Sequence, residues 1–249
     1  MLIKAANHLP KRIILVLTLL SLLLCSCIQK KAPSEESQPP PNKYDNYPTV
    51  IIDAGHGGED SGAIGIDGCL EKHLNLSVAT ELEILLKSQG INTRLTRTED
   101  ILLYDRNSDY QGHKKSQDMA ARIKISQEYS NAVFVSIHMN SFPQSQYSGL
   151  QVYYSPNSPN SKILADKVQK LTVINLQPEN NRQIKLGTDI YILENINHPA
   201  ILIEGGFISN PNECELLNSQ QYRKRLCMVI FSAILQYFDA VENNNGYTT

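Results

Sequence analysis

The chain has 249 residues, of which 41% are hydrophobic, and it carries 23 Lys and Arg against 25 Asp and Glu. An apolar fraction near the globular average with a low net charge excludes a wholly disordered chain, a collagen-like repeat and a disulfide-dense mini-protein. The sequence pI of about 6.3 argues against nucleic-acid binding, which is typical of basic domains, so no nucleic-acid partner is expected.

The N-terminus has the pattern of an export signal. Lys4, Lys11 and Arg12 precede an uncharged run of 15 residues from Ile13 to Cys27. A membrane-spanning helix needs about 20 apolar residues, so we expect export followed by cleavage rather than an uncleaved anchor. Residues 1–26 are therefore predicted to be a signal peptide.

The end of this run, Leu24-Cys25-Ser26-Cys27, resembles a bacterial lipobox and makes Cys27 the candidate lipidation site. Lipidation at Cys25 would instead put Leu24 at the −1 position, where a small residue is expected. An ordinary cleaved signal, or an uncleaved anchor, with two incidental cysteines is the alternative. Residues 27–47 are rich in Pro, Ser and charged side chains, which is typical of a flexible linker.

From residue 48 onward, short apolar runs alternate with amphipathic segments. The first run stops at a glycine-rich turn, and the first helical pattern stops at Gly90. Asn210, Pro211 and Glu213 have the spacing of an N-cap, a first helical proline and a capping-box glutamate. Strands are predicted at 49–53, 92–96, 132–137, 150–154, 190–193 and 200–203, helices at 71–89, 118–129, 161–171, from 211 and at 221–238, and a loop at 97–115.

This alternation predicts an α/β fold: a single domain, residues 48–240, with a mostly parallel twisted sheet and helices on both faces. Residues 241–249 are predicted to be a C-terminal tail. The spacing of Cys69, Cys214 and Cys227 matches no zinc-finger pattern. These cysteines are expected to be mostly small buried side chains, and whether any two form a disulfide is left open.

Three of the apolar strands end on residues that an apolar strand rarely needs. His56 follows the first strand, His138 lies at the end of the run 132–137, and Glu204 directly follows the run 200–203. The carboxyl ends of parallel strands are where α/β sheets bind ligands, so we expect these three side chains to converge. Glu71 begins the helix after the first strand, and the glycines between residues 55 and 68 allow that helix start to fold back towards them.

Two imidazoles and a carboxylate are the ligand set of catalytic zinc, and a further carboxylate can accept a proton from water. Glu204 is the preferred base, but spacing alone leaves open which of Glu71 and Glu204 binds metal. Each residue also has a structural interpretation, for example Glu71 as a charge favoured at a helix N-terminus. A serine or cysteine nucleophile is disfavoured because the chain has no G-x-S-x-G turn. His73, His113 and His198 are interpreted as surface or structural residues.

Five ordered motifs resemble those of the zinc-dependent N-acetylmuramoyl-L-alanine amidases, the family called amidase 3. They extend the resemblance over nearly the whole mature domain, from about Thr49 to Phe238. The motifs are I-D-A-G-H-G-G at residues 52–58, L-E-K-x-x-N-L at 70–76, R-x-x-I at 122–125, S-I-H-x-N at 136–140 and I-E-G-G-F-I-S-N at 203–210.

The resemblance implies that one zinc ion is bound by His56, Glu71 and His138, and that Glu204 is the catalytic glutamate. Asn75 and Asn140 match family positions near the metal, so hydrogen bonds to ligands or substrate are expected of them. The family cleaves the amide between N-acetylmuramic acid and L-Ala, so the implied partner is peptidoglycan or its muropeptide fragments, in cell separation and wall remodelling. Together with the lipobox, this predicts an exported protein that is lipid-anchored in the bacterial cell envelope.

The chain also departs from parts of the family. Only 65 residues separate His138 from Glu204, so the inhibitory helix that some cell-division amidases insert there is not expected. Regulation by an activator protein is unknown, and the loop 97–115 is where substrate contacts are expected to differ. Two alternatives remain: a zinc peptidase that cuts within the stem peptide, and a metal-dead wall-binding lipoprotein.

Overall fold

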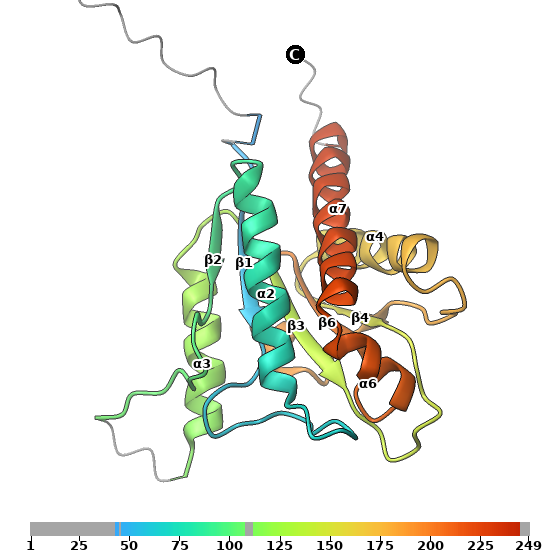
Figure 1. Ribbon diagram of the computed structural model, residues 1–249. Helices are drawn as coiled ribbons and strands as arrows, with labels where there is room; N and C mark the ends of the chain where they lie inside the picture. Colours follow the sequence, from blue (N-terminus) through green and yellow to red (C-terminus); the bar gives the residue numbers. More distant parts are fainter. Residues whose placement is uncertain (1–42, 45, 108–111, 245–249) are drawn as a thin grey trace, which may run out of the picture. The chain divides into compact units, whose positions relative to one another are not determined.

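The computed structural model describes residues 43–44, 46–107 and 112–244 (Figure 1). The predicted signal peptide and Cys27 lie outside these residues, as do most of the linker 27–47 and the last part of the tail. The elements in chain order are β1 (Thr49–Ala54), α2 (Glu71–Ser88), β2 (Thr93–Leu95), α3 (Lys114–Gln127), β3 (Ala132–Asn140), β4 (Gln151–Tyr154), α4 (Pro159–Asn175), β5 (Lys185–Leu186), α5 (Tyr191–Glu194), β6 (Ala200–Phe207), α6 (Pro211–Asn218) and α7 (Gln220–Asn244).

The strands form one sheet of six in the order β2-β1-β3-β6-β4-β5. Strands β2, β1, β3 and β6 are parallel neighbours, whereas β4 runs antiparallel to β6. The central strands are continuous apolar runs because helices cover both of their faces. This confirms the prediction of a mostly parallel sheet in an α/β domain.

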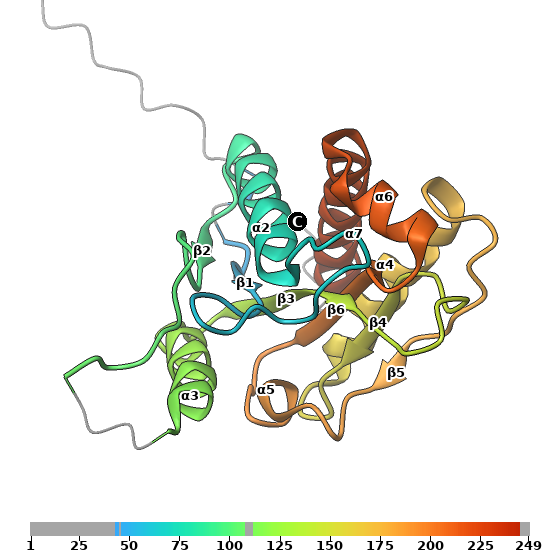
Figure 2. The same ribbon diagram turned by 60° about the horizontal axis from the view of Figure 1, so that its bottom comes forward.

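Alternate residues of each central strand enter two separate cores. Val50, Ile52, Val135 and Ile203 pack under α2, α4 and α7. Their neighbours Ile51, Phe134 and Leu202 face the other way, with side chains from α3 and α5. Figure 2 shows α2 and α7 on one side of the sheet and α3 and α5 on the other.

Helix α2 follows its predicted pattern closely. Leu74, Val78, Leu82 and Leu86 recur every four residues, and all are buried. Helix α7 is long and apolar enough to span a membrane by composition alone. Its buried side chains, such as Leu226 and Ile230, instead belong to the core that α7 shares with α2 and α4.

At the N-terminus of α6 the predicted N-cap is confirmed, but the predicted capping box is wrong. The Asn210 side chain accepts hydrogen bonds from the backbone N–H groups of Asn212 and Glu213 at 3.0 and 3.1 Å, as an N-cap does. Glu213 does not close a capping box. Its carboxylate instead accepts the N–H groups of Phe207 and Gly149 at 2.7 and 2.9 Å, and thereby links the end of β6 to the segment before β4.

The strand predicted at 190–193 is wrong, because these residues begin the short helix α5. A four-residue apolar run has no periodicity that separates a strand from a buried helical turn, and here Ile192 and Leu193 fill the core between α3 and the sheet. The edge strand β5 was missed because it has only two residues, both exposed. Helix α3 begins at Lys114, four residues before its predicted start and within the predicted loop.

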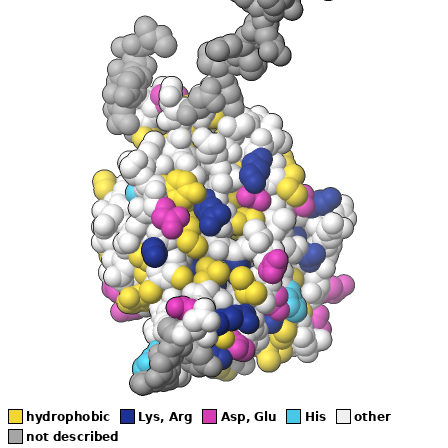
Figure 3. All heavy atoms as spheres, turned by 90° about the vertical axis from the view of Figure 1, so that its left-hand side faces the viewer, with side chains coloured by type: hydrophobic (Ala, Val, Ile, Leu, Met, Phe, Trp, Pro, Cys, Tyr) yellow, Lys and Arg dark blue, Asp and Glu magenta, His cyan; other side chains and the backbone are white. Residues whose placement is uncertain are grey.

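Charged side chains are mixed on the face that carries α3 and β2. Lys and Arg alternate there with Asp and Glu around a band of hydrophobic side chains (Figure 3). No single sign of charge dominates this view of the described residues.

Candidate metal and catalytic site

The predicted site residues come from three adjacent strands and one helix start. His56 follows β1, while His138 and Glu204 lie within β3 and β6, which extend further than the sequence predicted. His138 and Glu204 are register partners on these two parallel strands. Because register partners point to the same face of a sheet, both side chains lie on the side covered by α3 and α5.

Glu71, the first residue of α2, joins the two histidines. Its two carboxylate oxygens lie 3.2 Å from His56 Nε2 and 3.0 Å from His138 Nδ1. One donor atom from each of the three residues lies within 4.8 Å of the others. The structure thus brings together the three side chains that the sequence named as metal ligands.

The glycine-rich loop between β1 and α2 makes this approach geometrically feasible. Gly62 has φ +65°, and a Cβ there would lie 2.5 Å from Glu71 Oε2 and 2.7 Å from His56 Cδ2. The backbone N–H of the next residue, Ala63, donates to the same Glu71 oxygen at 2.8 Å. Glycine is therefore required at residue 62 for both conformation and space.

The electrostatics of the cluster favour a charged Glu71. Burial alone would raise the pKa of Glu71, but the hydrogen bonds from His138 and His56 outweigh it and hold that pKa well below its usual range. Burial likewise opposes charge on His56, yet hydrogen bonds to Asp60 and Glu71 raise its pKa to about 9.

Glu204 differs from Glu71 in having no partner for one oxygen. Although the residue is partly exposed, its Oε2 atom is buried and makes no hydrogen bond within the described residues. Burial raises the pKa of Glu204 to about 7, which attraction to His138 only partly offsets. A carboxylate with a pKa near neutrality and a free oxygen can take up and release a proton.

Two buried arginines hold the backbone around His56, a feature that the sequence analysis did not identify. Arg122 on α3 donates to the carbonyl oxygens of Ala54 and His56, both at 2.7 Å. Arg97 donates to the carbonyl oxygens of Ala54 and Gly55 at 2.9 and 3.0 Å. His56 itself has φ +62°, a conformation that a non-glycine residue adopts only when its surroundings enforce it.

Asp53 neutralises one of these arginines. It is 1% exposed, binds Arg122 Nη1 at 2.6 Å and accepts hydrogen bonds from Thr96 and Ser136 at 2.8 and 2.6 Å. Burial would raise the pKa of Asp53, but Arg122 outweighs it and lowers that pKa. Two features of the sequence could have indicated this network: Asp53, a charged residue at the end of a buried strand, and Arg122, the first residue of the R-x-x-I motif.

Asp60 is a further residue whose role was not predicted from the sequence. Its carboxylate lies 2.8 Å from His56 Nδ1 and 2.9 Å from Lys115 Nζ. A carboxylate on the far nitrogen of a metal-binding histidine fixes the ring and its tautomer. The spacing of four residues after His56 was the only signal in the sequence.

The two asparagines occupy different positions. Asn75 donates to Glu71 Oε1 at 3.2 Å and to the Gly55 carbonyl at 3.1 Å, so it contacts the cluster. Asn140 lies at the end of β3, beyond an irregularity in register that follows His138. Its backbone carbonyl accepts the N–H of Ile208 at 2.9 Å. Among the remaining histidines, His73 and His113 are exposed and His198 is half-buried, and none of the three belongs to the group of donor atoms around Glu71.

A cavity of about 260 Å³ opens beside the cluster. His56, Asp60 and His138 form one wall, and Met119 of α3 and Tyr191 of α5 contribute to the others. The helix that replaces the predicted strand at 190–193 therefore lies at the site. An imidazole pair with a charged carboxylate fits zinc by donor chemistry, and the neighbouring cavity leaves room for a substrate.

Solved structures of similar proteins share this fold. The CwlD amidase from Clostridioides difficile, solved in complex with the GerS lipoprotein, is 36% identical with a TM-score of 0.73, over 78% of this chain and 99% of that one. The N-acetylmuramoyl-L-alanine amidase AmiC2 of Nostoc punctiforme is 30% identical with a TM-score of 0.65, over 77% of this chain and 97% of that one. The fold and the site thus define the catalytic domain of a cell-wall amidase.

Sequence comparison identifies the family. The family described as N-acetylmuramoyl-L-alanine amidase (Amidase_3) matches residues 50–236, and the chain belongs to it. The germination-specific N-acetylmuramoyl-L-alanine amidase of Bacillus subtilis (strain 168) is 33% identical over 189 residues, which cover 76% of this chain and 79% of that protein. The resemblance drawn from the five motifs is therefore confirmed.

Proposed function

We propose that this chain cleaves the amide between N-acetylmuramic acid and L-alanine in peptidoglycan, with zinc held by His56, Glu71 and His138. The observation that carries the proposal is the unpartnered Oε2 of Glu204, on the residue opposite His138 in the sheet. A buried carboxylate oxygen without a partner is costly, and a catalytic role accounts for its retention.

Zinc, when bound, supplies a Lewis acid that polarises the scissile carbonyl and makes water a better nucleophile. Glu204 accepts the proton of the attacking water at Oε2 and then returns it to the leaving amine of L-alanine. Its pKa of about 7 suits both directions of transfer.

The residues around the ligands act through them. Asp60 orients the His56 ring, and Asn75 donates to Glu71 Oε1, the oxygen that Ala63 does not contact. Arg97 and Arg122 fix the backbone that carries His56. The cavity between α3 and α5 accepts the part of the substrate next to the scissile bond.

The proposed cellular location of the protein rests on its predicted signal peptide and lipidation site. Export through the signal peptide 1–26 and a lipid on Cys27 would tether the catalytic domain in the cell envelope by the linker 27–47. Such a position suits cell separation and wall remodelling. The lipid anchor is tested by metabolic labelling with a clickable fatty acid, since Cys27→Ser should abolish the label and Cys25→Ser should not.

Mass spectrometry of digested peptidoglycan tests the reaction. Purified sacculi are incubated with the chain loaded with zinc, with the same chain in chelator, and with Glu204→Gln. The proposal expects intact stem peptides with a free L-alanine amine only from the zinc-loaded wild type. Shortened stem peptides would identify a peptidase instead, and binding of sacculi without any release would indicate a wall-binding protein.

A further inference from the structure

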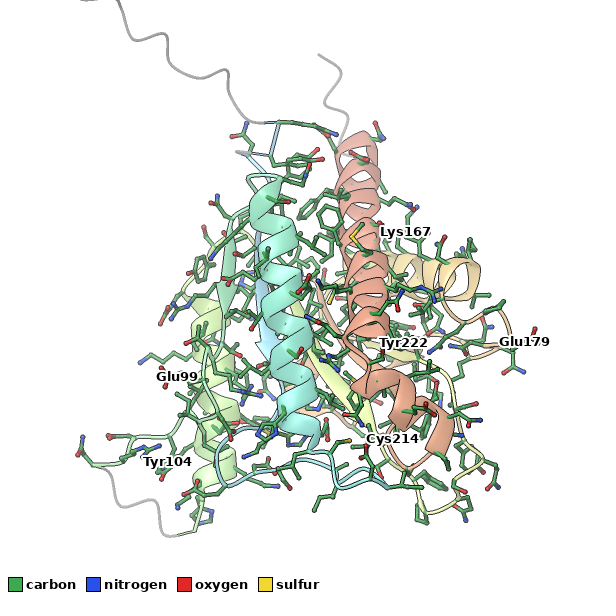
Figure 4. The ribbon with its side chains drawn as sticks, viewed as in Figure 1. Glu99, Tyr104, Lys167, Glu179, Cys214 and Tyr222 are labelled. Atoms are coloured by element: carbon green, nitrogen blue, oxygen red, sulfur yellow. The ribbon has the colours of Figure 1, made fainter. Side chains whose placement is uncertain are left out.

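Two cysteine thiols lie side by side and are not part of the cluster of His56, Glu71 and His138. Cys69 belongs to the loop before α2 and Cys214 to α6, and their sulfur atoms are 3.7 Å apart across 145 positions of sequence. Cys69 is half-buried and Cys214 is buried. Figure 4 labels Cys214 on α6, close to the start of α2.

Hydrogen bonds between the loop before α2 and α6 keep the two sulfur atoms close together. Asp67 accepts the backbone N–H of Cys69 at 2.9 Å and the side-chain amide of Asn218, one turn after Cys214, at 2.6 Å. The N–H of Ile66 also bonds to the carbonyl of Ile208 at 3.1 Å. These bonds attach the loop to α6 and to the end of β6. The Cys214 thiol also donates to Asp67 Oδ1 at 3.2 Å, a hydrogen bond that a disulfide would replace.

Gly65 leaves the space that the two sulfurs occupy. A Cβ at residue 65 would lie 2.5 Å from Cys69 Sγ and 3.0 Å from Cys214 Sγ. Any side chain there would separate the thiols. The fold therefore brings the two cysteines together, and the lack of a side chain at Gly65 leaves room for both sulfur atoms.

A metal is the other ligand that such a group could take, since Asp67, Cys69 and Cys214 offer donor atoms within 4.8 Å of one another. Structural zinc, however, takes four protein ligands, and this group within the described chain contains three. Both oxygens of Asp67 are also already hydrogen-bonded. We propose instead that Cys69 and Cys214 form a disulfide that joins the loop carrying Glu71 to α6.

The oxidant is a disulfide compound, such as oxidised glutathione or an exchange catalyst. Burial and the neighbouring Asp67 raise the pKa of the Cys69 thiol to about 12, so a small thiolate fraction attacks the oxidant. The attack releases one thiolate and leaves a mixed disulfide on Cys69. Cys214, as a thiolate, then attacks Cys69 Sγ and displaces the second thiolate. Two protons leave the protein and two electrons pass to the oxidant, which becomes a pair of thiols.

The bond would close a very long loop and restrain the start of α2. Constraint of the unfolded chain by a loop of this length is expected to raise the melting temperature by about 10 °C. Because Glu71 is only two residues after Cys69, the oxidised chain is also expected to release its metal more slowly. This inference does not depend on the proposed amidase reaction.

Peptide mapping of the full chain in detergent tests the proposal directly. The chain is treated with oxidised glutathione, free thiols are alkylated, and a digest is analysed with and without reductant. The expected result is a linked peptide pair containing Cys69 and Cys214, with Cys227 alkylated. Free Cys69 and Cys214 after oxidation, or a second equivalent of zinc bound by the reduced chain, would overturn the proposal.

Melting curves supply a second, independent test with a matched control. Cys227 is buried in α7, and its sulfur contacts the Val78 carbonyl rather than another sulfur. The melting temperature of wild type and of Cys227→Ser should rise on oxidation, whereas Cys69→Ser and Cys214→Ser should show no rise. An equal response of all four chains would contradict a link between Cys69 and Cys214.

Discussion

Glu204 lies opposite His138 in the register of two neighbouring parallel strands. His138 contacts the buried carboxylate of Glu71, and Glu204 has a buried oxygen, Oε2, without a hydrogen-bond partner among the described residues. Adjacent strands hold their register partners only a few ångströms apart, so a proposed metal ligand and a proposed base are kept at a fixed separation by the sheet itself.

Substitution of Glu204 by Gln should lower the rate of amide cleavage by about 10²- to 10⁴-fold, because the acceptor of the water proton is lost while shape is retained. Zinc binding, measured by competition with a chromogenic chelator, should persist. The control is Glu215→Gln, an exposed carboxylate on α6 that should leave the rate unchanged. Full activity of Glu204→Gln would exclude Glu204 as the base.

The same substitution should stabilise the metal-free chain at alkaline pH. The folded-state pKa of Glu204 is about 7, above its ordinary value of 4.5, so the wild type loses stability as pH rises from 4.5 to 7. Glu204→Gln removes that cost and should raise the free energy of unfolding by up to about 3 kcal/mol at pH 8. Urea unfolding in chelator at pH 4 and pH 8 checks this, because the two chains should differ only at pH 8.

Zinc affinity should increase with pH up to about 9. His56 holds a proton in the metal-free chain because Asp60 and Glu71 outweigh its burial, and metal must displace that proton. The apparent affinity is therefore expected to rise about tenfold per pH unit between pH 7 and 9, and to level off above. Calorimetric titration in buffers of different ionisation enthalpy would reveal the released proton, and a flat profile would show that His56 is already neutral.

Arg122→Lys should weaken zinc binding although the charge is kept. Lysine cannot reproduce the simultaneous bonds of the guanidinium to Asp53, Asp118 and the carbonyls of Ala54 and His56. We expect a loss of about 10- to 100-fold in affinity, as for other residues that orient metal ligands. Arg94→Lys, on the exposed face of β2, is the matched control. Equal affinity in both variants would remove Arg122 from the positioning network.

Gly62→Ala and Gly68→Ala separate backbone strain from steric conflict. Both glycines have positive φ, but a Cβ at Gly62 meets Glu71 and His56, whereas one at Gly68 meets nothing within 4 Å. Each variant should lose about 1 kcal/mol or more of stability, and only Gly62→Ala should also lose zinc affinity. Thermal unfolding and chelator competition measure the two effects. Zinc loss in Gly68→Ala would mean that loop conformation, rather than space, decides metal binding.

The amino-acid sequence by itself determined the order of strands and helices, the alternation that buries both faces of a parallel sheet, and the glycine loop between His56 and Glu71. Local hydrophobic periodicity and turn chemistry carry that information, because each acts within a few residues. The same reasoning failed at residues 190–193, where a short apolar run fits either a strand or a helical turn, and at the two-residue strand β5.

Only the tertiary structure decided which distant groups meet. Asp60 on the His56 ring, the two arginines on the backbone carbonyls, the free Oε2 of Glu204 and the pairing of Cys69 with Cys214 all depend on contacts that local pattern does not encode. Strand order brings β1, β3 and β6 together. Burial then raises the pKa of Glu204, whereas hydrogen bonds outweigh burial at Glu71 and His56. The sequence thus proposed which residues carry the chemistry, whereas their protonation and their supporting contacts arise from packing.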